Sequence, residues 1–200
     1  MPLATNKQAL VHRDITMNTE ISTVRKIKIT ELERLDPITV YIEDLSPGRG
    51  KITVECYGRT WSSFWPAMGK RSIAQFFVDC NEDYIANNFV PGINDTNDDW
   101  NAFASKVKAR VLYCRREGLI SEEAARDIYE FDDWASIYNA PGDAWPCIGS
   151  ATDEEVDSLA LYEIDVPQVE NSDYKYLCLI ITTVQAALKE LDKTNLPEVA

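Results

Sequence analysis

The chain has 200 residues, of which 45% are hydrophobic and 10% aromatic, and its formal net charge is −13. This apolar content is typical of globular domains and is too high for intrinsic disorder, even at that charge. No apolar run reaches the roughly 18 residues that a membrane span needs, and the N-terminus lacks a signal-peptide pattern. We therefore expect a cytoplasmic protein that does not bind membranes.

Residues 1–20 show no periodicity, and we expect a flexible leader there, with Met17 as a candidate internal start. Residues 21–200 are expected to form a single α+β domain. From about residue 24 to residue 65, apolar residues alternate with polar ones, which predicts an antiparallel β-meander of three or four strands. The turn signals are Asp36-Pro37, Ser46–Gly50 and Gly58-Arg59.

From about residue 72 to residue 192 the period changes to 3.6, which predicts about four helices packed with the sheet. The expected helices are Ser72 to Tyr84, Trp100 to Cys114, Ser121 to Tyr138, and Ser172 to Asp192. The second and third are expected to form an αα-hairpin, with Gly118 at the turn. Residues 139–172 are irregular, with a short helical turn expected around Glu154–Tyr162.

The sequence carries no catalytic, cofactor or zinc motif. Its five cysteines are widely spaced without a CxxC pair, and His12 is the only histidine. Nucleophilic catalysis needs a base beside a serine or cysteine, and zinc needs clustered ligands. We therefore predict a protein that is not an enzyme and that binds no cofactor or metal ion, with a carboxylate-metal enzyme kept as an alternative.

Charge divides unevenly along the chain. Residues 1–78 hold 11 basic and 8 acidic residues, whereas residues 79–200 hold 9 basic and 25 acidic ones. Between Arg126 and Lys175 there are thirteen acids and no lysine, arginine or histidine. An acidic half repels nucleic acid and anionic membranes, so no direct nucleic-acid contact is expected through it, and it favours a basic partner.

The acidic stretch has three interpretations. It is a solvated face that keeps the protein in solution, a docking surface for a basic protein groove, or a mimic of nucleic-acid phosphates. The residues predicted to bind a partner are Asp132, Asp133, Asp153, Glu154, Glu155 and Asp157.

Residues 61–71 combine aromatic side chains with cations. As a secondary recognition surface we consider Trp61, Trp65, Lys70 and Arg71, because aromatic residues and arginine are common interface anchors. The alternative is that the tryptophans lie in the core, between the sheet and the first helix.

One set of residues resembles a known protein family. The set is Lys51-Ile-Thr53, Cys56-Tyr57-Gly58, Trp61, Trp65, Met68-Gly69, Arg71, Ile73 and Phe76-Phe77, with Met17–Ile21 and Tyr174–Cys178. This pattern is similar to an uncharacterised family of small accessory proteins of tailed phages and prophages of enteric bacteria, over roughly residues 17–190. Members begin near Met17, so residues 1–16 depart from the pattern.

The resemblance implies a genomic context but no activity. Phage accessory genes often encode inhibitors of host defence, so we predict a non-catalytic acidic protein in the host cytoplasm that binds and inhibits a host protein. A nucleic-acid-handling defence complex, inhibited in the anti-CRISPR or anti-restriction manner, is the sharpest form. The alternatives are a virion component and a nucleic-acid-binding regulator using the mixed sheet face with Lys26, Lys28, Tyr41, Tyr57 and Arg59. The sequence leaves the oligomeric state open.

Overall fold

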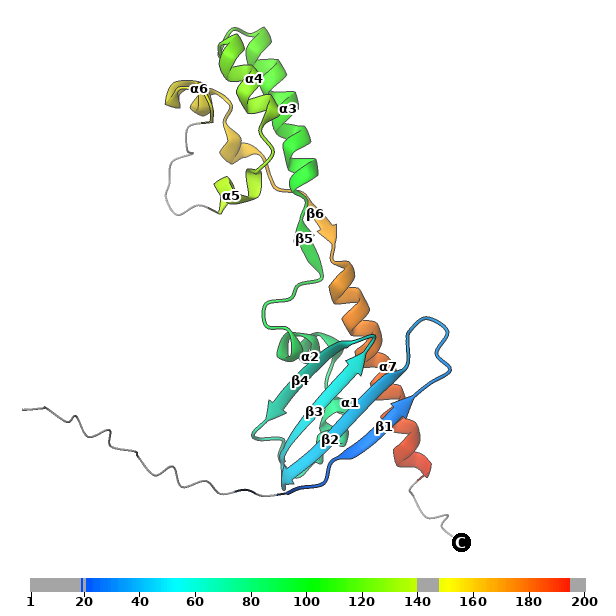
Figure 1. The fold of residues 1–200 in the computed structure, drawn as a ribbon. Helices are drawn as coiled ribbons and strands as arrows, with labels where there is room; N and C mark the ends of the chain where they lie inside the picture. The colour runs from blue at the N-terminus through cyan, green and yellow to red at the C-terminus, as the bar shows by residue number, and fades with distance from the viewer. Residues whose placement is uncertain (1–18, 20, 140–147, 195–200) are drawn as a thin grey trace, which may run out of the picture. The chain divides into compact units, whose positions relative to one another are not determined.

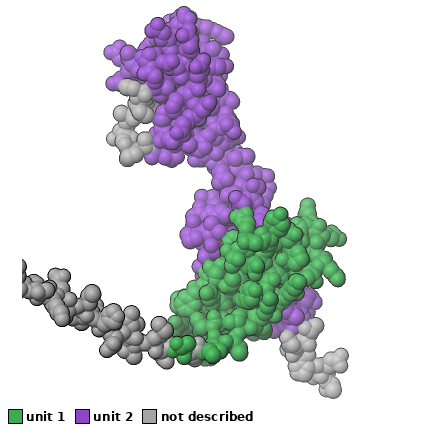
Figure 2. Space-filling view, in the orientation of Figure 1, with its two compact units in different colours: residues 1–77 green, residues 78–200 purple. Residues whose placement is uncertain are grey.

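The computed structural model describes residue 19, residues 21–139 and residues 148–194. The chain divides into two compact units, residues 1–77 and residues 78–200 (Figure 2). The sequence pattern predicted one domain over residues 21–200 and did not show this division, which falls inside the first helix. Apart from residue 19, the predicted leader lies outside the described residues.

The first unit is built on a four-stranded antiparallel sheet, as predicted. Its strands β1 (Arg25–Ile29), β2 (Ile38–Ser46), β3 (Arg49–Cys56) and β4 (Arg59–Trp65) pair in chain order (Figure 1). Alternate residues point to opposite faces of a strand, and the apolar members of the alternation lie on one face. The buried residues of that face on the two central strands are Ile38, Val40, Ile42, Ile52, Val54 and Cys56.

The tight turns of the meander depend on left-handed backbone conformations. Tyr57 and Gly58, between β3 and β4, have φ angles of 48° and 73°. Two consecutive positive φ angles are the signature of the two-residue hairpin turn whose twist matches the strands. Gly48, between β2 and β3, has φ 73°, and its carbonyl accepts a hydrogen bond from the Met68 amide at 2.7 Å.

The predicted helix from Ser72 to Tyr84 is wrong in length, because the chain forms two helices there. The first, α1 (Ile73–Asp79), begins where predicted, with the Ser72 hydroxyl accepting from the Gln75 amide. The second, α2 (Glu82–Phe89), begins after Asn81, whose side-chain oxygen accepts from the Tyr84 amide at 2.8 Å. An asparagine that caps a new helix competes with continuing the old one.

The second unit contains the last helix, α7 (Ser172–Thr194), close to its predicted bounds. It packs against α2, and two side chains fix the pair. Gln185 Nε2 donates to the Cys80 carbonyl at 2.7 Å, and the Tyr174 hydroxyl donates to the Asp83 carboxylate. The latter bond raises the pKa of Tyr174 well above its usual value. The buried stripe of α7 comprises Leu177, Ile180, Ile181, Val184 and Leu188.

A short antiparallel ribbon, absent from the sequence prediction, interrupts the second unit between α2 and α7. It pairs β5 (Thr96–Asp98) with β6 (Gln168–Glu170). At one end of the ribbon the Asp99 amide donates to the Pro167 carbonyl at 2.7 Å, and at the other the Asn171 amide donates to the Asp95 carbonyl at 2.8 Å. The chain between Asp99 and Pro167 therefore enters and leaves at one place, and we call residues 99–167 the helical segment.

The described part of the helical segment holds five helical elements around its own core. They are α3 (Trp100–Arg116), α4 (Glu122–Glu130), α5 (Trp134–Tyr138), α6 (Asp153–Ser158) and the 3-10 helix η1 (Leu161–Glu163). Contacts between α3 and α4 fit the predicted αα-hairpin (Figure 1). The core comprises Phe103, Val107, Val111, Cys114, Ile120, Ala124, Ile128, Trp134, Ile148, Ala151, Val156, Leu159 and Leu161.

Two details of the predicted helical half need correction. The expected helix from Ser121 to Tyr138 is two helices, because Phe131 is extended and Asp133 caps α5. The described residues contain seven α-helices, more than the four or so predicted. The α+β class itself is confirmed: an N-terminal antiparallel sheet is followed by a largely helical half.

Candidate partner-binding surface

Charge in the helical segment is sorted by element. Helix α3 carries five of the six basic residues and no acid, whereas residues 117–167 carry fourteen acids and one cation, Arg126. The acidic stretch read from the sequence therefore sits beside a basic helix. The sequence does carry a signal for this basic helix, since residues 100–116 hold five basic residues and no acid.

Glu155 joins the starts of two acidic helices. One carboxylate oxygen accepts from the Ser121 amide at 2.7 Å, and the other accepts from the Thr152 amide at 2.9 Å and the Thr152 hydroxyl at 3.1 Å. The Thr152 hydroxyl in turn accepts from the Glu155 amide, which completes a capping box at the start of α6. Because Ser121 is itself the N-cap of α4, this carboxylate links the first turns of α4 and α6.

The same bonds explain the acidity of Glu155. Hydrogen bonds from Thr152 and then from Ser121 favour the charged form and lower the pKa of Glu155 to about 2. Of the six residues predicted to bind a partner, Glu155 is thus the one whose carboxylate links the starts of two helices. The sequence did not distinguish it from its neighbours, because its contact with Ser121 spans 34 positions.

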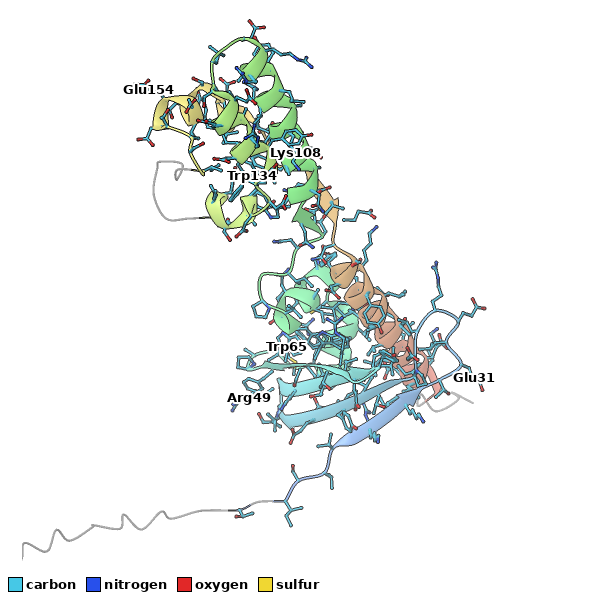
Figure 3. The ribbon with its side chains drawn as sticks, turned by 45° about the horizontal axis from the view of Figure 1, so that its top comes forward. Glu31, Arg49, Trp65, Lys108, Trp134 and Glu154 are labelled. Carbon is cyan, nitrogen blue, oxygen red and sulfur yellow. The ribbon has the colours of Figure 1, made fainter. Side chains whose placement is uncertain are left out.

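The link places exposed acids of α4 and α6 next to each other. Acids in a first helical turn are favoured by the helix dipole, and both helices have them. We call the following exposed residues the α4–α6 acidic surface: Glu122, Glu123, Asp153, Glu154 and Asp157. Glu154 projects outward from α6 (Figure 3). Within the described part of the chain, the carboxylates of Glu154 and Asp157 make no hydrogen bond or ion pair.

Nearby cations offset this surface only in part. Arg115 and Arg126 both approach Glu122, at 3.8 and 3.1 Å. Exposed ion pairs of this kind contribute about 0–1 kcal/mol each. Among the described residues, the negative charges of Glu154 and Asp157 have no ion-pair partner that would offset them.

The structure separates Asp132 and Asp133 from the other predicted residues. They follow the C-terminal end of α4, whose nine residues span about 13 Å along the helix axis. Asp133 accepts from the Ser136 amide at 3.4 Å as the N-cap of α5, while Asp132 is exposed. The two therefore extend the acidic character of this side of the segment without joining the α4–α6 acidic surface.

A second acid has a structural role that the sequence did not reveal. Asp127 accepts hydrogen bonds from both the amide and the hydroxyl of Ser150, each at 2.7 Å. These bonds lower the pKa of Asp127. The bonds tie α4 to the loop that precedes α6, so the acidic elements form one connected structure.

Two of the four residues predicted to form a secondary recognition surface are buried, and the other two are exposed. Trp61 and Trp65 are only 6% and 4% exposed and face the core side of the sheet, so they cannot act as exposed anchors. This agrees with the alternative interpretation, in which the tryptophans lie in the core. Lys70 and Arg71 are exposed, and the Arg71 guanidinium donates to the Met68 carbonyl at 3.2 Å and lies 4.8 Å from the Phe76 ring centroid.

A shallow groove of about 440 Å³ lies on the basic side of the helical segment. Its walls are Lys106, Ala109, Arg110 and Tyr113 of α3 with residues 163–165. Lys106 donates to the Asp165 carbonyl at 3.1 Å, and Arg110 lies 3.8 Å from Glu163. The two cations of the groove, Lys106 and Arg110, therefore interact with residues of its opposite wall.

No group of three or more histidine, cysteine, aspartate or glutamate side chains in residues 21–139 and 148–194 is arranged to hold a metal ion. In the same ranges no helix combines the length and the apolar character that a bilayer crossing requires.

Comparison with known proteins identifies the family. The chain belongs to a phage protein family, whose model, described as a phage family, matches residues 17–190. This confirms the resemblance to phage proteins over the span expected from the sequence. No curated protein and no solved structure matches the chain significantly.

Proposed function

We propose that this phage-family protein is a non-catalytic binding protein that uses its α4–α6 acidic surface to bind and inhibit a host protein with a basic surface. The observation that carries the proposal is the Glu155 link, which holds the acidic first turns of α4 and α6 together. A surface held in one conformation loses less conformational entropy on binding than separate mobile acids would.

The electrostatics of the segment favour a basic partner. Residues 117–167 carry fourteen acids against one cation. Complementary charge accelerates diffusional encounter and makes association sensitive to salt. Like charge repels nucleic acid itself, so a protein is the expected partner of this surface.

The sharpest version of the proposal is nucleic-acid mimicry directed at a host defence complex. A duplex carries one charge per about 1.7 Å of axis, or about nine charges over 15 Å. Without Asp127 and Glu155, whose carboxylates hold elements together, the acids from Glu122 to Asp132 and those of α6 number seven, which approaches the number of charges on such a duplex. A channel that binds nucleic acid through lysine and arginine side chains would accept such a surface.

The test compares three forms of the full chain as bait in a lysate of the bacterial host. They are the wild type, the double reversal Glu154→Lys/Asp157→Lys, and the control reversal Glu33→Lys/Asp192→Lys. The control makes the same charge change at exposed acids outside the helical segment. We expect the wild type and the control to retain the same host protein, and the Glu154→Lys/Asp157→Lys bait to lose it.

Two further measurements sharpen the result. Raising NaCl from about 0.1 M to about 0.5 M shortens the screening length and should release the partner. Added duplex DNA should compete with the bait if the surface mimics nucleic acid. Undiminished capture of the same protein by a folded Glu154→Lys/Asp157→Lys bait would contradict the proposal.

A further inference from the structure

The solvent-exposed face of the β1–β4 sheet has a chemical character unlike that of the helical segment. The pairing of the four strands places its residues in three cross-strand rows, whose members share this face. The rows are Glu43–Lys51–Phe64, Lys26–Tyr41–Thr53–Ser62 and Lys28–Thr39–Glu55–Thr60. All of these side chains are exposed or half-buried. The residues that alternate with them along the two central strands are buried on the opposite face.

Two aromatic rings on this face each have a cation against them. Lys26 Nζ lies 5.5 Å from the Tyr41 ring centroid, and the Arg49 guanidinium lies 5.7 Å from the Phe64 ring centroid. Arg49 extends from the start of β3 (Figure 3), and Phe64 remains 44% exposed. A cation within about 6 Å of a ring is attracted to its face. Each ring is therefore paired with a positive charge that can also reach a phosphate.

The local charge is positive. Four cations, Lys26, Lys28, Arg49 and Lys51, stand against the two carboxylates of Glu43 and Glu55. At 0.1 M salt, charges more than about 10 Å away are largely screened. The field at this face is thus set by its own residues and not by the net charge of the chain.

The face also carries a depression beside one of the rings. It has a volume of about 250 Å³ and is lined by Val24, Tyr41, Glu43, Lys51 and Thr53. That volume exceeds the volume of one nucleobase. The Tyr41 ring and the Val24 side chain supply apolar walls, and Lys51 supplies a positive charge at the rim.

We propose that this sheet face binds single-stranded nucleic acid, with bases stacked on Tyr41 and Phe64 and phosphates held by Lys26, Lys28, Arg49 and Lys51. A positive surface that presents exposed aromatic rings is the common architecture for binding single strands. The two rings lie two strands and two residues apart, about 12 Å from strand geometry. This separation suits bases that are not adjacent on an extended single strand.

The composition of the face argues against two other occupants. A duplex keeps its base faces stacked inside, so the half-buried Tyr41 ring and the exposed Phe64 ring would have no role in binding it. A protein partner prefers an apolar interface core, whereas Val24 is the one aliphatic side chain among the described residues that line the depression. The other non-aromatic side chains of the three rows are lysine, glutamate, threonine and serine.

The geometry revises the residues that the sequence assigned to nucleic-acid binding. Lys26, Lys28 and Tyr41 share the exposed face, as expected from their alternation. Arg59 lies 5.3 Å from the Trp61 ring centroid on the core side of the sheet, and Tyr57 occupies the β3–β4 turn. Arg49, Lys51 and Phe64 take their place. This inference does not depend on the proposed function, since it uses no residue of α4–α6.

The test measures fluorescence anisotropy of a labelled single-stranded oligonucleotide and of its duplex, with the full-length protein at about 0.05 M and about 0.2 M NaCl. Lys26→Gln/Lys51→Gln removes two charges from the face, and Lys189→Gln/Lys193→Gln removes two exposed charges from α7 as the control. Phe64→Leu removes one ring but keeps an apolar side chain, and Tyr162→Leu removes an exposed ring from η1 as its control.

We expect the single strand to bind at least tenfold more tightly than the duplex. Phe64→Leu should weaken binding on the order of tenfold, the effect of losing one stacked base. Lys26→Gln/Lys51→Gln should reduce the slope of log K against log salt by about 1 to 2, because two phosphate contacts are lost. Both controls should bind like the wild type.

Three outcomes would overturn the proposal. The first is an absence of single-strand binding by the folded protein at about 0.05 M NaCl, and the second is equal affinity for single strand and duplex. The third is an equal effect of the sheet-face variants and their controls. A change of oligomeric mass in Lys26→Gln/Lys51→Gln without any change in nucleic-acid affinity would assign the face to a second copy of the chain instead.

Discussion

The sheet and the helical segment use charged side chains in opposite ways. On the sheet, the polar rows of β1–β4 share one face and the core residues occupy the other, although Arg59 lies on the core side and Asp44 accepts a hydrogen bond from the Ile73 amide. In the helical segment, acids with similar sequence surroundings have different roles. Glu155 and Asp127 hold elements together, while Glu154 and Asp157 face solvent.

This difference follows from the length of the elements. A strand of seven to nine residues with period-two alternation fixes the direction of each side chain. Helices of five to nine residues such as α4, α5 and α6 leave a large share of their backbone amides without partners inside the helix. Side-chain oxygens near each helix start accept hydrogen bonds from these amides. In this segment Glu155 and Asp133 are among the residues that supply such oxygens. A local excess of acids is therefore not by itself a measure of binding surface.

The largest expected effect tests whether the helical segment depends on its own core. Phe103 is fully buried, and its ring lies within 6.0 Å of the rings of Trp100, Trp134 and Tyr138, measured between centroids. Phe103→Ala should cost about 3–5 kcal/mol of the segment's stability. Leu112→Ala, at a half-exposed position of the same helix, is the control and should cost far less.

The measurement is amide hydrogen exchange resolved by residue. We expect Phe103→Ala to accelerate exchange in α3, α4 and α6 and to leave β2 and β3 protected. Equal loss of protection in the helical segment and in the sheet would show that the two unfold in one cooperative step. It would contradict the view that the helical segment is stabilised by its own core.

A smaller effect is expected at the β2–β3 turn. Gly48 has φ 73°, and a Cβ built there would lie 2.0 Å from the Gly69 carbonyl oxygen. Gly58 has the same φ, with open space around the added atom. Both alanine variants incur the left-handed cost of about 1–2 kcal/mol, and Gly48→Ala adds a steric cost of about 1–3 kcal/mol.

Urea unfolding followed by circular dichroism measures the difference between the two variants. We expect the free energy of unfolding of Gly48→Ala to be lower than that of Gly58→Ala by the steric cost of about 1–3 kcal/mol. The sheet should lose its signal at a lower urea concentration than the helical segment. Equal stability of the two would mean that the Gly48–Gly69 contact relaxes without cost.

The smallest effect concerns the Glu155 link and its dependence on pH. The folded-state pKa of Glu155 is about 2, below its ordinary value of 4.5, so the link stabilises the protein above pH 4.5 and is lost as pH falls toward 2. Glu155→Gln removes the charge at every pH. At pH 7 the variant should therefore melt below the wild type, and the gap should close between about pH 4.5 and pH 2.

Exchange of the Ser121 amide offers a direct check, because this amide donates to the Glu155 carboxylate. We expect faster exchange at Ser121 in Glu155→Gln, with little change at the Ala124 amide, whose partner is the Ser121 hydroxyl. A melting difference that stays constant from pH 7 to pH 2 would show that Glu155 acts through something other than its charge.

Strands and long helices were predictable from the sequence, for a physical reason. The apolar periods of β1–β4, α3 and α7 are long enough to specify one buried face. The breaks at Asn81 and Asp133 were not predicted, because an apolar stripe continues across each of them and the competing cap is a single side chain. The β5–β6 ribbon has three residues per strand and shows no alternation, so its pairing depends on contacts about 70 positions apart.

The candidate surfaces were predictable only in part. Periodicity placed Lys26, Lys28 and Tyr41 together, and the run of acids in residues 127–174 drew attention to α6. The role of Glu155 required knowing that Ser121 lies beside it, and the burial of Trp61 required knowing which face of β4 meets the core. Both are tertiary facts that no local window of sequence contains.

The central claim is that the α4–α6 acidic surface is a binding surface and not only a solvated face. The most direct measurement is the association rate constant of the purified protein with the host protein captured by it, at about 0.05 M and about 0.3 M NaCl. The account predicts a rate that falls at least tenfold with salt for the wild type and for Glu33→Lys/Asp192→Lys, and a low, nearly salt-independent rate for Glu154→Lys/Asp157→Lys. Equal association rates for all three forms, with equal salt dependence, would contradict it.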